Sequence, residues 1–350
     1  MATTREFLER LSVSSGVTGF EGSEIAGIVT EAFKEYCDEV FTDALGNVVG
    51  HKKSAGKYKV LFAAHMDEIG LMVSGYEKGG FLRFTTIGGY DQRSLVSQEV
   101  FVHGKEDIYG VIGVKPPHIT TPEEARKAHK IEDMAIDTGL DDEKLKSLVR
   151  IGDVITIKRD VVKLLNDVIA GKALDDRAGI AAMYECMKTL KNTDCDIDVY
   201  YAATVQEEIG CKGAGPLCYA LEPDIAIALD VGHAKTPDVR ENQAVGWDKG
   251  PTISCGINIH PKVFKTLVKT AKDHFIDHQV IAEPGRSGTD AVTMQVARYG
   301  TCSGVISIPL KYMHTSVETI RMKDVTLTGM LLSSYILDLC GQDLEEILCL

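Results

Sequence analysis

Five short stretches of the sequence place carboxylate or imidazole side chains directly after apolar runs. They are Ala64-His65-Met66-Asp67-Glu68, Leu174-Asp175-Asp176, Val205-Gln206-Glu207-Glu208, Leu229-Asp230 and Tyr312-Met313-His314. Mixed imidazole and carboxylate donors, with no cysteine among them, are ligands that suit Zn²⁺ and also Co²⁺ or Mn²⁺. Two-metal hydrolases need one shared carboxylate, two further ligands for each ion and an unbound base. Together the stretches supply that set.

Each stretch has a plainer explanation when it is taken alone. An Asp at the start of a helix can be a cap, and an Asp that ends a strand is often a turn residue. A lone His is often a packing residue. Glu207 and Glu208, however, follow so apolar a segment that they would repel each other and resist burial. Because a nearby cation removes that cost, the combination favours a metal site.

The apolar segments before these residues are typical of buried strands. They cover residues 58–64, 198–205, 225–230 and 301–308. Helical periodicity covers residues 178–190, 264–275 and 325–339. The alternation predicts an α/β fold with a mostly parallel sheet, whose ligands bind at the carboxyl ends of the strands.

Between residues 70 and 160 the pattern changes to short alternating strands separated by Gly-rich turns. One charged run, 122–148, has a helical pattern. We therefore expect a small β-rich insertion over residues 70–163, with the α/β domain formed by residues 1–69 and 164–350.

Composition narrows the classes of function. The chain has 350 residues, 44% of them hydrophobic, and a formal net charge of −13. So acidic a protein repels phosphate backbones and anionic lipids, which argues against nucleic-acid or membrane partners. The beginning of the chain lacks the apolar core of a signal peptide and instead predicts a helix capped by Thr3 or Thr4. The nine cysteines are scattered, and we expect them to be reduced packing residues of a cytoplasmic protein.

At this point the motifs resemble a known family along nearly the whole chain, the tetrahedral (TET) or glutamyl-aminopeptidase-like metallopeptidases. Further agreement lies at residues 15–21, 43–47, 87–90, 113–118 and 288–290. The resemblance implies a zinc-peptidase catalytic domain with an inserted β-barrel or PDZ-like dimerisation domain. It also implies dimers that assemble into a hollow tetrahedral dodecamer.

The resemblance implies a role for each matching residue. His65 and Asp230 would bind one metal ion, Glu208 and His314 the other, and Asp175 both. Two roles fall to residues that bind no metal: Glu207 would be the general base, and Asp67 would hold His65. A cis peptide bond is expected between Asp175 and Asp176.

The activity implied is removal of N-terminal residues from short peptides with a free amino terminus. Two divalent ions per subunit, Zn²⁺ first and Co²⁺ or Mn²⁺ as alternatives, would bridge a water whose proton Glu207 takes. The preferred N-terminal side chain stays open. Arg286, Ser287 and His118 are candidates for substrate contacts or for structural roles. One departure is Lys311, where the family leads us to expect Arg, whose forked geometry lysine lacks.

Other activities remain alternatives. A carboxypeptidase or deacylase could use the same dinuclear site. A glycoside hydrolase also uses two carboxyls, but these face each other across a sugar, whereas Glu207 and Glu208 are neighbours in sequence. A single tryptophan, Trp247, offers few platforms for a polysaccharide. A non-catalytic scaffold is disfavoured because Glu207 is present together with every ligand.

Overall fold

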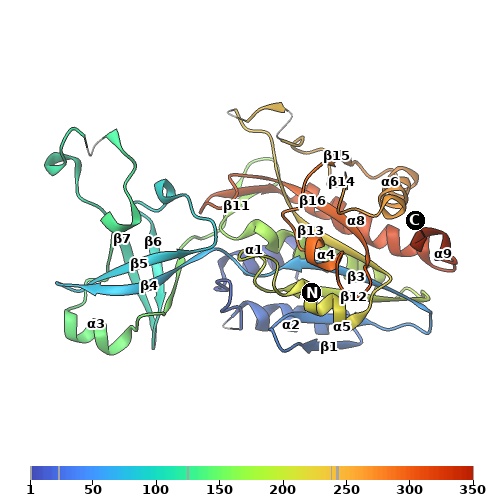
Figure 1. Ribbon diagram of the computed structural model, residues 1–350, viewed down its shortest axis with the longest axis horizontal. Helices are drawn as coiled ribbons and strands as arrows, with labels where there is room; N and C mark the ends of the chain where they lie inside the picture. The colour runs from blue at the N-terminus through green and yellow to red at the C-terminus, as the bar shows by residue number, and fades with distance from the viewer. Residues whose placement is uncertain (1, 23, 124–125, 238, 242–243, 350) are drawn as a thin grey trace.

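A mixed sheet of eleven strands forms the larger of two bodies (Figure 1). The computed structural model describes every residue except 1, 23, 124–125, 238, 242–243 and 350. The strands of this sheet are β1 (Glu39–Thr42), β2 (Val48–Lys52), β3 (Tyr58–His65), β10 (Val162–Leu164), β11 (Val168–Gly171), β12 (Ile197–Thr204), β13 (Ile225–His233), β14 (Thr252–Gly256), β15 (Gln279–Glu283), β16 (Cys302–Lys311) and β17 (Glu318–Arg321). The four central strands, in the order β12, β3, β13 and β16, are parallel, and the strands beside them are antiparallel.

Helices cover both faces of this sheet. They are α1 (Thr4–Val13), α2 (Ile25–Lys34), α4 (Leu174–Leu190), α5 (Ala214–Leu221), α6 (Pro261–Asp273), α7 (Ala291–Met294), α8 (Met322–Leu339) and α9 (Glu345–Leu348). Successive residues of a strand point to opposite faces. Accordingly Phe62 packs in the core that contains α2, α4 and α8, and its neighbour Leu61 packs in the core that contains α5 and α7. The expected N-terminal helix is α1, and Thr3 is its cap.

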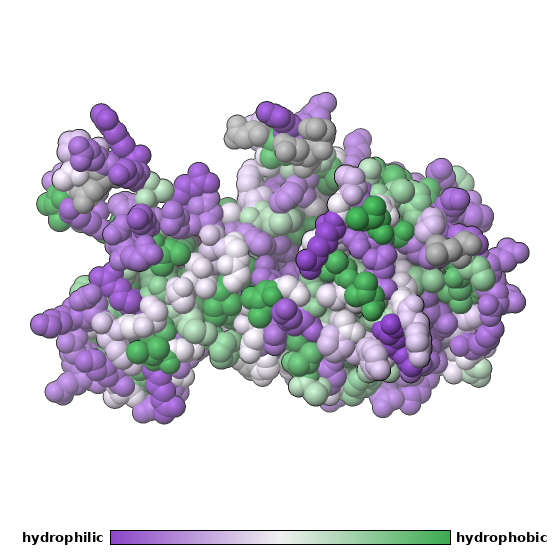
Figure 2. All heavy atoms as spheres, viewed as in Figure 1, coloured by the Kyte–Doolittle hydropathy of each residue, from purple (hydrophilic) through white to green (hydrophobic). Residues whose placement is uncertain are grey.

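The second body is a closed barrel of six antiparallel strands. It is formed by β4 (Gly70–Glu77), β5 (Phe81–Ile87), β6 (Glu99–His103), β7 (Asp107–Gly113), β8 (Ala135–Asp137) and β9 (Val154–Ile157). The barrel order is β4-β5-β8-β7-β6-β9, and its core includes Leu71, Leu82 and Ile136. Figure 1 shows it on one side of the α/β body, as expected for a β-rich insertion. On the face drawn in Figure 2, hydrophilic residues dominate the periphery, and apolar residues gather nearer the centre.

The expected helix over residues 122–148 was largely wrong. Within its described residues, only α3 (Asp142–Leu148) is α-helical, and a single turn spans Ile131–Asp133. Strand β8 lies between them because Ile136 fills the barrel core and the backbone pairs with both β5 and β7. Gly139, with a φ of +69°, then turns the chain toward α3. Tertiary pairing thus overrode the local helical pattern.

The expectation that every cysteine is reduced was also wrong. Cys195 and Cys340 form a disulfide with their Cα atoms 5.5 Å apart, joining the end of α8 to the segment before β12. The two residues are 145 positions apart, so their spacing carries no signal. The other seven cysteines are free. Among the described residues, no helix is long and apolar enough to cross a membrane.

Candidate active site

The end of β3 supplies the first part of the site. The His65 imidazole is buried, and its Nε2 lies 3.1 Å from Asp175 Oδ1. Its Nδ1 lies 3.1 Å from the backbone oxygen of Asp67 and 3.5 Å from the Asp67 carboxylate. That carboxylate also accepts the backbone N–H groups of Glu207 at 3.1 Å and Glu208 at 3.2 Å. Asp67 therefore ties the end of β3 to the segment after β12.

Asp175 lies between two imidazoles. Its Oδ2 is 3.4 Å from His314 Nε2, and the same nitrogen is 3.3 Å from Glu208 Oε1. The expected cis peptide bond joins Asp175 to Asp176. The donor atoms of His65, Asp175 and Asp230 all lie within 4.8 Å of one another, as do those of Asp175, Glu208 and His314. The structure thus brings five side chains into two donor groups that share Asp175.

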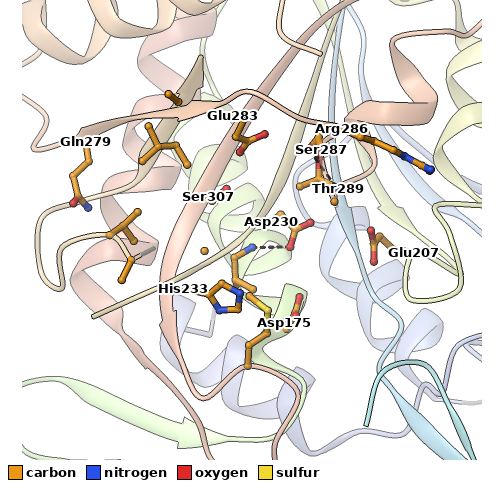
Figure 3. Close-up of a pocket in the computed structure, with 18 of the residues that line it drawn as sticks. Asp175, Glu207, Asp230, His233, Gln279, Glu283, Arg286, Ser287, Thr289 and Ser307 are labelled. Atoms are coloured by element: carbon orange, nitrogen blue, oxygen red, sulfur yellow. Dashed lines mark hydrogen bonds between the residues drawn. The ribbon is translucent and has the colours of Figure 1, made fainter. Parts of the chain in front are cut away.

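Two further carboxylates take different places. Glu207 lines the same cavity but belongs to neither donor group, and its Oε1 accepts a hydrogen bond from Cys211 Sγ at 3.1 Å. Asp230 does not terminate its strand as expected, because β13 continues through His233 in parallel pairing with β16. Its Oδ1 accepts the backbone N–H of Val231 at 2.7 Å (Figure 3).

Burial and crowding of charge shift the titration of these groups. Burial raises the pKa of Asp230, and the nearby carboxylates of Asp175 and Asp176 raise it further. Burial likewise raises the pKa of Glu207 to about 7, with a contribution from Asp290. Burial opposes protonation of His65, but hydrogen bonds with Asp175 and Asp67 outweigh it and raise the pKa of the imidazole. Packing so many acids together is costly unless positive charge lies among them.

Supporting residues escaped the sequence analysis. The buried Glu318 carboxylate accepts the backbone N–H groups of Leu174, Asp175 and His314 at 2.7, 3.1 and 2.8 Å. Its position four residues after His314 was the available signal. Behind the site, the fully buried Arg177 lies 3.2 Å from a carboxylate oxygen of Glu68. No pattern in the sequence around Arg177 or Glu68 predicts this ion pair.

The donor groups open into a cavity of about 1120 Å³ (Figure 3). Strand β15 and the segment after it form one wall of this cavity, which includes Glu283, Arg286 and Ser287. His118 does not line it in the described part of the chain. Lys311, where arginine was expected, places its Nζ 4.0 Å from the centre of the Trp247 ring. The cation therefore stacks on an aromatic face, which does not require a forked side chain.

Comparisons with known proteins agree with this geometry. The sequence profile of the M42 glutamyl aminopeptidase family matches residues 46–331. A lysyl aminopeptidase of Pyrococcus furiosus is 37% identical over 343 residues, which cover 97% of this chain and 98% of the relative. The structure of a TET aminopeptidase from a marine sediment archaeon of the Thaumarchaeota superposes with a TM-score of 0.92 at 33% identity, covering 98% of both chains. The TET1 peptidase of Pyrococcus horikoshii, described as assembling into a tetrahedron or a large octahedral shell, gives a TM-score of 0.85 at 30% identity, covering 95% of this chain and 99% of the other. The chain therefore belongs to the M42 glutamyl aminopeptidase family.

Proposed function

We propose that this protein is a metal-dependent aminopeptidase that removes single residues from the amino ends of short peptides, with Glu207 as the general base. One observation carries the proposal. Two donor groups that share Asp175 meet at the carboxyl ends of β3, β12, β13 and β16, in a cavity that Glu207 also lines. Ligand sites of open α/β sheets lie at this edge.

The residues present fit a pair of divalent ions. His65 and Asp230 would hold one ion, Glu208 and His314 the other, and Asp175 both. Their imidazole and carboxylate donors suit Zn²⁺ first, and Co²⁺ or Mn²⁺ as alternatives. Burial and mutual repulsion raise the pKa of Asp230, and a bound cation would relieve that repulsion. When bound, such ions acidify water and polarise a carbonyl group.

Side chains of the protein would transfer the protons and position the base. Glu207 takes a proton from the attacking water on a carboxylate oxygen and gives it to the leaving amine. Its place outside both donor groups leaves that carboxylate available for proton transfer. Asp67 accepts the backbone N–H groups of Glu207 and Glu208 and thereby fixes the base relative to a ligand.

The proposal is tested with a peptide that has a free amine and with its N-acetylated twin. We expect cleavage of the first only, loss of cleavage after chelation, and recovery when Zn²⁺, Co²⁺ or Mn²⁺ is added. Glu207→Gln should retain both metal ions and lose activity by about 10²–10⁴-fold. The exposed Glu106→Gln is the matched control. Cleavage of the acetylated twin would point to a deacylase or carboxypeptidase, and undiminished turnover after chelation would refute metal dependence.

We also propose that the protein self-associates through its barrel into dimers and then into a tetrahedral dodecamer. Support comes from the barrel's position beside the α/β body and from the shells formed by the Pyrococcus horikoshii relative. Light scattering after size exclusion should give a mass of twelve chains. Substitutions on the barrel surface that disrupt the contact between chains should give monomers. A monomeric wild type would contradict the proposal.

A further inference from the structure

The cavity extends from the donor groups toward β15, where it contains a carboxylate that the proposed mechanism does not use. Glu283, the last residue of β15, lines this end of the cavity and is half-buried. Its Oε1 accepts a hydrogen bond from the hydroxyl of Ser254, a buried residue of the neighbouring strand β14, at 2.7 Å. The hydroxyl is neutral, so it holds the carboxylate in place without balancing its charge.

No cationic side chain in the described part of the chain lies within ion-pair distance of Glu283. A half-buried carboxylate with only a neutral partner is stabilised when a cation binds beside it. Asp175, Glu208 and Asp230 would share the charge of the proposed metal ions. Glu283 belongs to neither donor group, so its negative charge is left for a ligand.

The other charged residues of the cavity do not cancel that charge. Glu241 is exposed and already paired with Lys235 at 2.6 Å, so it neither adds a free negative charge nor offers a positive one. Arg286 is exposed, and Figure 3 shows its side chain extending away from Glu283. The end of the cavity at Glu283 is therefore negative.

The position of Glu283 relative to the reacting centre indicates which part of a substrate it meets. In the view of Figure 3, Glu283 lies above Asp230, and Glu207 lies to the right of Asp230. Glu207, Asp230 and Glu283 line one cavity, so a substrate whose scissile bond faces Glu207 has room to extend its N-terminal side chain toward Glu283. Val231, Val245 and Ile281 line the cavity and offer apolar contacts to a methylene chain. Apolar walls that end in a carboxylate suit a side chain with an aliphatic stem and a cationic tip.

We infer that this end of the cavity binds the side chain of the substrate's N-terminal residue and selects lysine or arginine, with Glu283 as the residue that determines this specificity. The inference rests on the proposed aminopeptidase function and adds the substrate class to it.

The kinetic test compares kcat/KM for Lys-, Arg-, Leu- and Glu-p-nitroanilides. The wild type should cleave the Lys and Arg substrates fastest and the Glu substrate slowest. Glu283→Gln keeps the side-chain shape and the Ser254 contact but removes the charge. It should reduce the Lys-to-Leu ratio about tenfold or more, the effect of losing a hydrogen bond between charged groups. Glu283→Lys should move the preference toward the Glu substrate. Glu106→Gln, on the barrel, controls for a general effect of removing a carboxylate.

Two results would overturn the inference. A wild type that prefers the Glu substrate and loses this preference in Arg286→Gln would assign specificity to Arg286. An equal loss on the Lys and Leu substrates in Glu283→Gln would give Glu283 a structural role only.

A binding measurement separates this inference from the function on which it rests. Calorimetry compares free L-lysine with L-norleucine, which has a similar stem without the ammonium group. Wild-type protein should bind lysine more tightly, and Glu283→Gln should bind the two equally. Without hydrolysis of any aminoacyl substrate, the proposed function fails while this comparison still decides the role of Glu283. With hydrolysis but equal binding of both amino acids, only the inference fails.

Discussion

The Glu318 carboxylate accepts the backbone N–H of Asp175 at 3.1 Å. The same oxygen accepts the N–H of Leu174 at 2.7 Å, and the other oxygen accepts the N–H of His314 at 2.8 Å. One buried side chain thus fixes both the start of α4 and the loop after β16. Because a backbone N–H faces each carboxylate oxygen of Glu318, a side chain at this position needs two acceptor oxygens.

Glu318→Gln should weaken metal binding. The NH₂ group of the introduced glutamine would face a backbone N–H. Either the start of α4 or the loop after β16 would then lose its hydrogen-bond acceptor and shift. We expect a loss of about 10–100-fold in metal affinity, which is typical when a residue that orients metal ligands is replaced. Competition with a chromogenic chelator measures it, and far-UV circular dichroism checks the fold. Unchanged affinity would show that Glu318 does not position the ligands.

Asp67→Asn tests the link between β3 and the segment after β12. The Asp67 carboxylate accepts N–H groups from both Glu207 and Glu208, and an amide can accept only through its one oxygen. We expect weaker metal binding and lower kcat, since both the base and a ligand shift. Metal titration and steady-state kinetics are the measurements. If the variant has the wild-type kcat at saturating metal, Asp67 contributes to metal binding but not to the position of the base.

Local patterns were enough to predict the central strands and to indicate the polar residues that gather at one edge of the sheet. Strand β3 is mostly apolar and ends at His65, and β12 is mostly apolar and ends three residues before Glu207. The structure brings His65, Asp175, Glu208, Asp230 and His314 together at this edge of the sheet. The order of residue types along the chain carried this information.

The missed features depend on contacts between distant segments. The hydrogen bonds of Glu318 to Leu174 and Asp175 span 144 and 143 residues, and the disulfide spans 145. Strand β8 exists because two other strands pair with it, although its own segment has a helical pattern. Single-sequence reasoning recognises local periodicity but not such pairings.

Removing the disulfide should lower the stability of the folded chain. The Cys195–Cys340 bond restrains the unfolded chain by closing a long loop, so Cys340→Ala should reduce the free energy of unfolding by about 2–4 kcal/mol. Urea unfolding without reductant measures the change, and Cys255→Ser, at an exposed free thiol, is the control. Nine titratable thiols in unreduced, denatured wild-type protein would show that the bond is absent.

Because of Lys172, the free energy of unfolding should increase as the pH rises in the alkaline range. Its Nζ is buried, donates to both carboxylate oxygens of Glu68 at 2.8 and 2.6 Å and to the Ser14 carbonyl at 3.0 Å. Burial lowers the pKa of Lys172 from 10.5 to about 8, although Glu68 opposes the shift. At a pH between these two pKa values, Lys172 therefore holds its proton more often in the unfolded chain than in the folded chain.

It follows that the free energy of unfolding attributable to Lys172 increases as pH rises through this window, by up to about 1.4 kcal/mol per pH unit. Below pH 8 the contribution is constant, because lysine is protonated in both states. Lys172→Met removes the titration, so the wild-type minus variant difference in unfolding free energy should climb between pH 8 and 10 and stay flat between pH 6 and 7.5. Urea unfolding of both proteins at matched metal concentration gives this difference. A difference that falls with rising pH would mean that the folded state holds the Lys172 proton more tightly than the unfolded state, and that the pair with Glu68 outweighs burial.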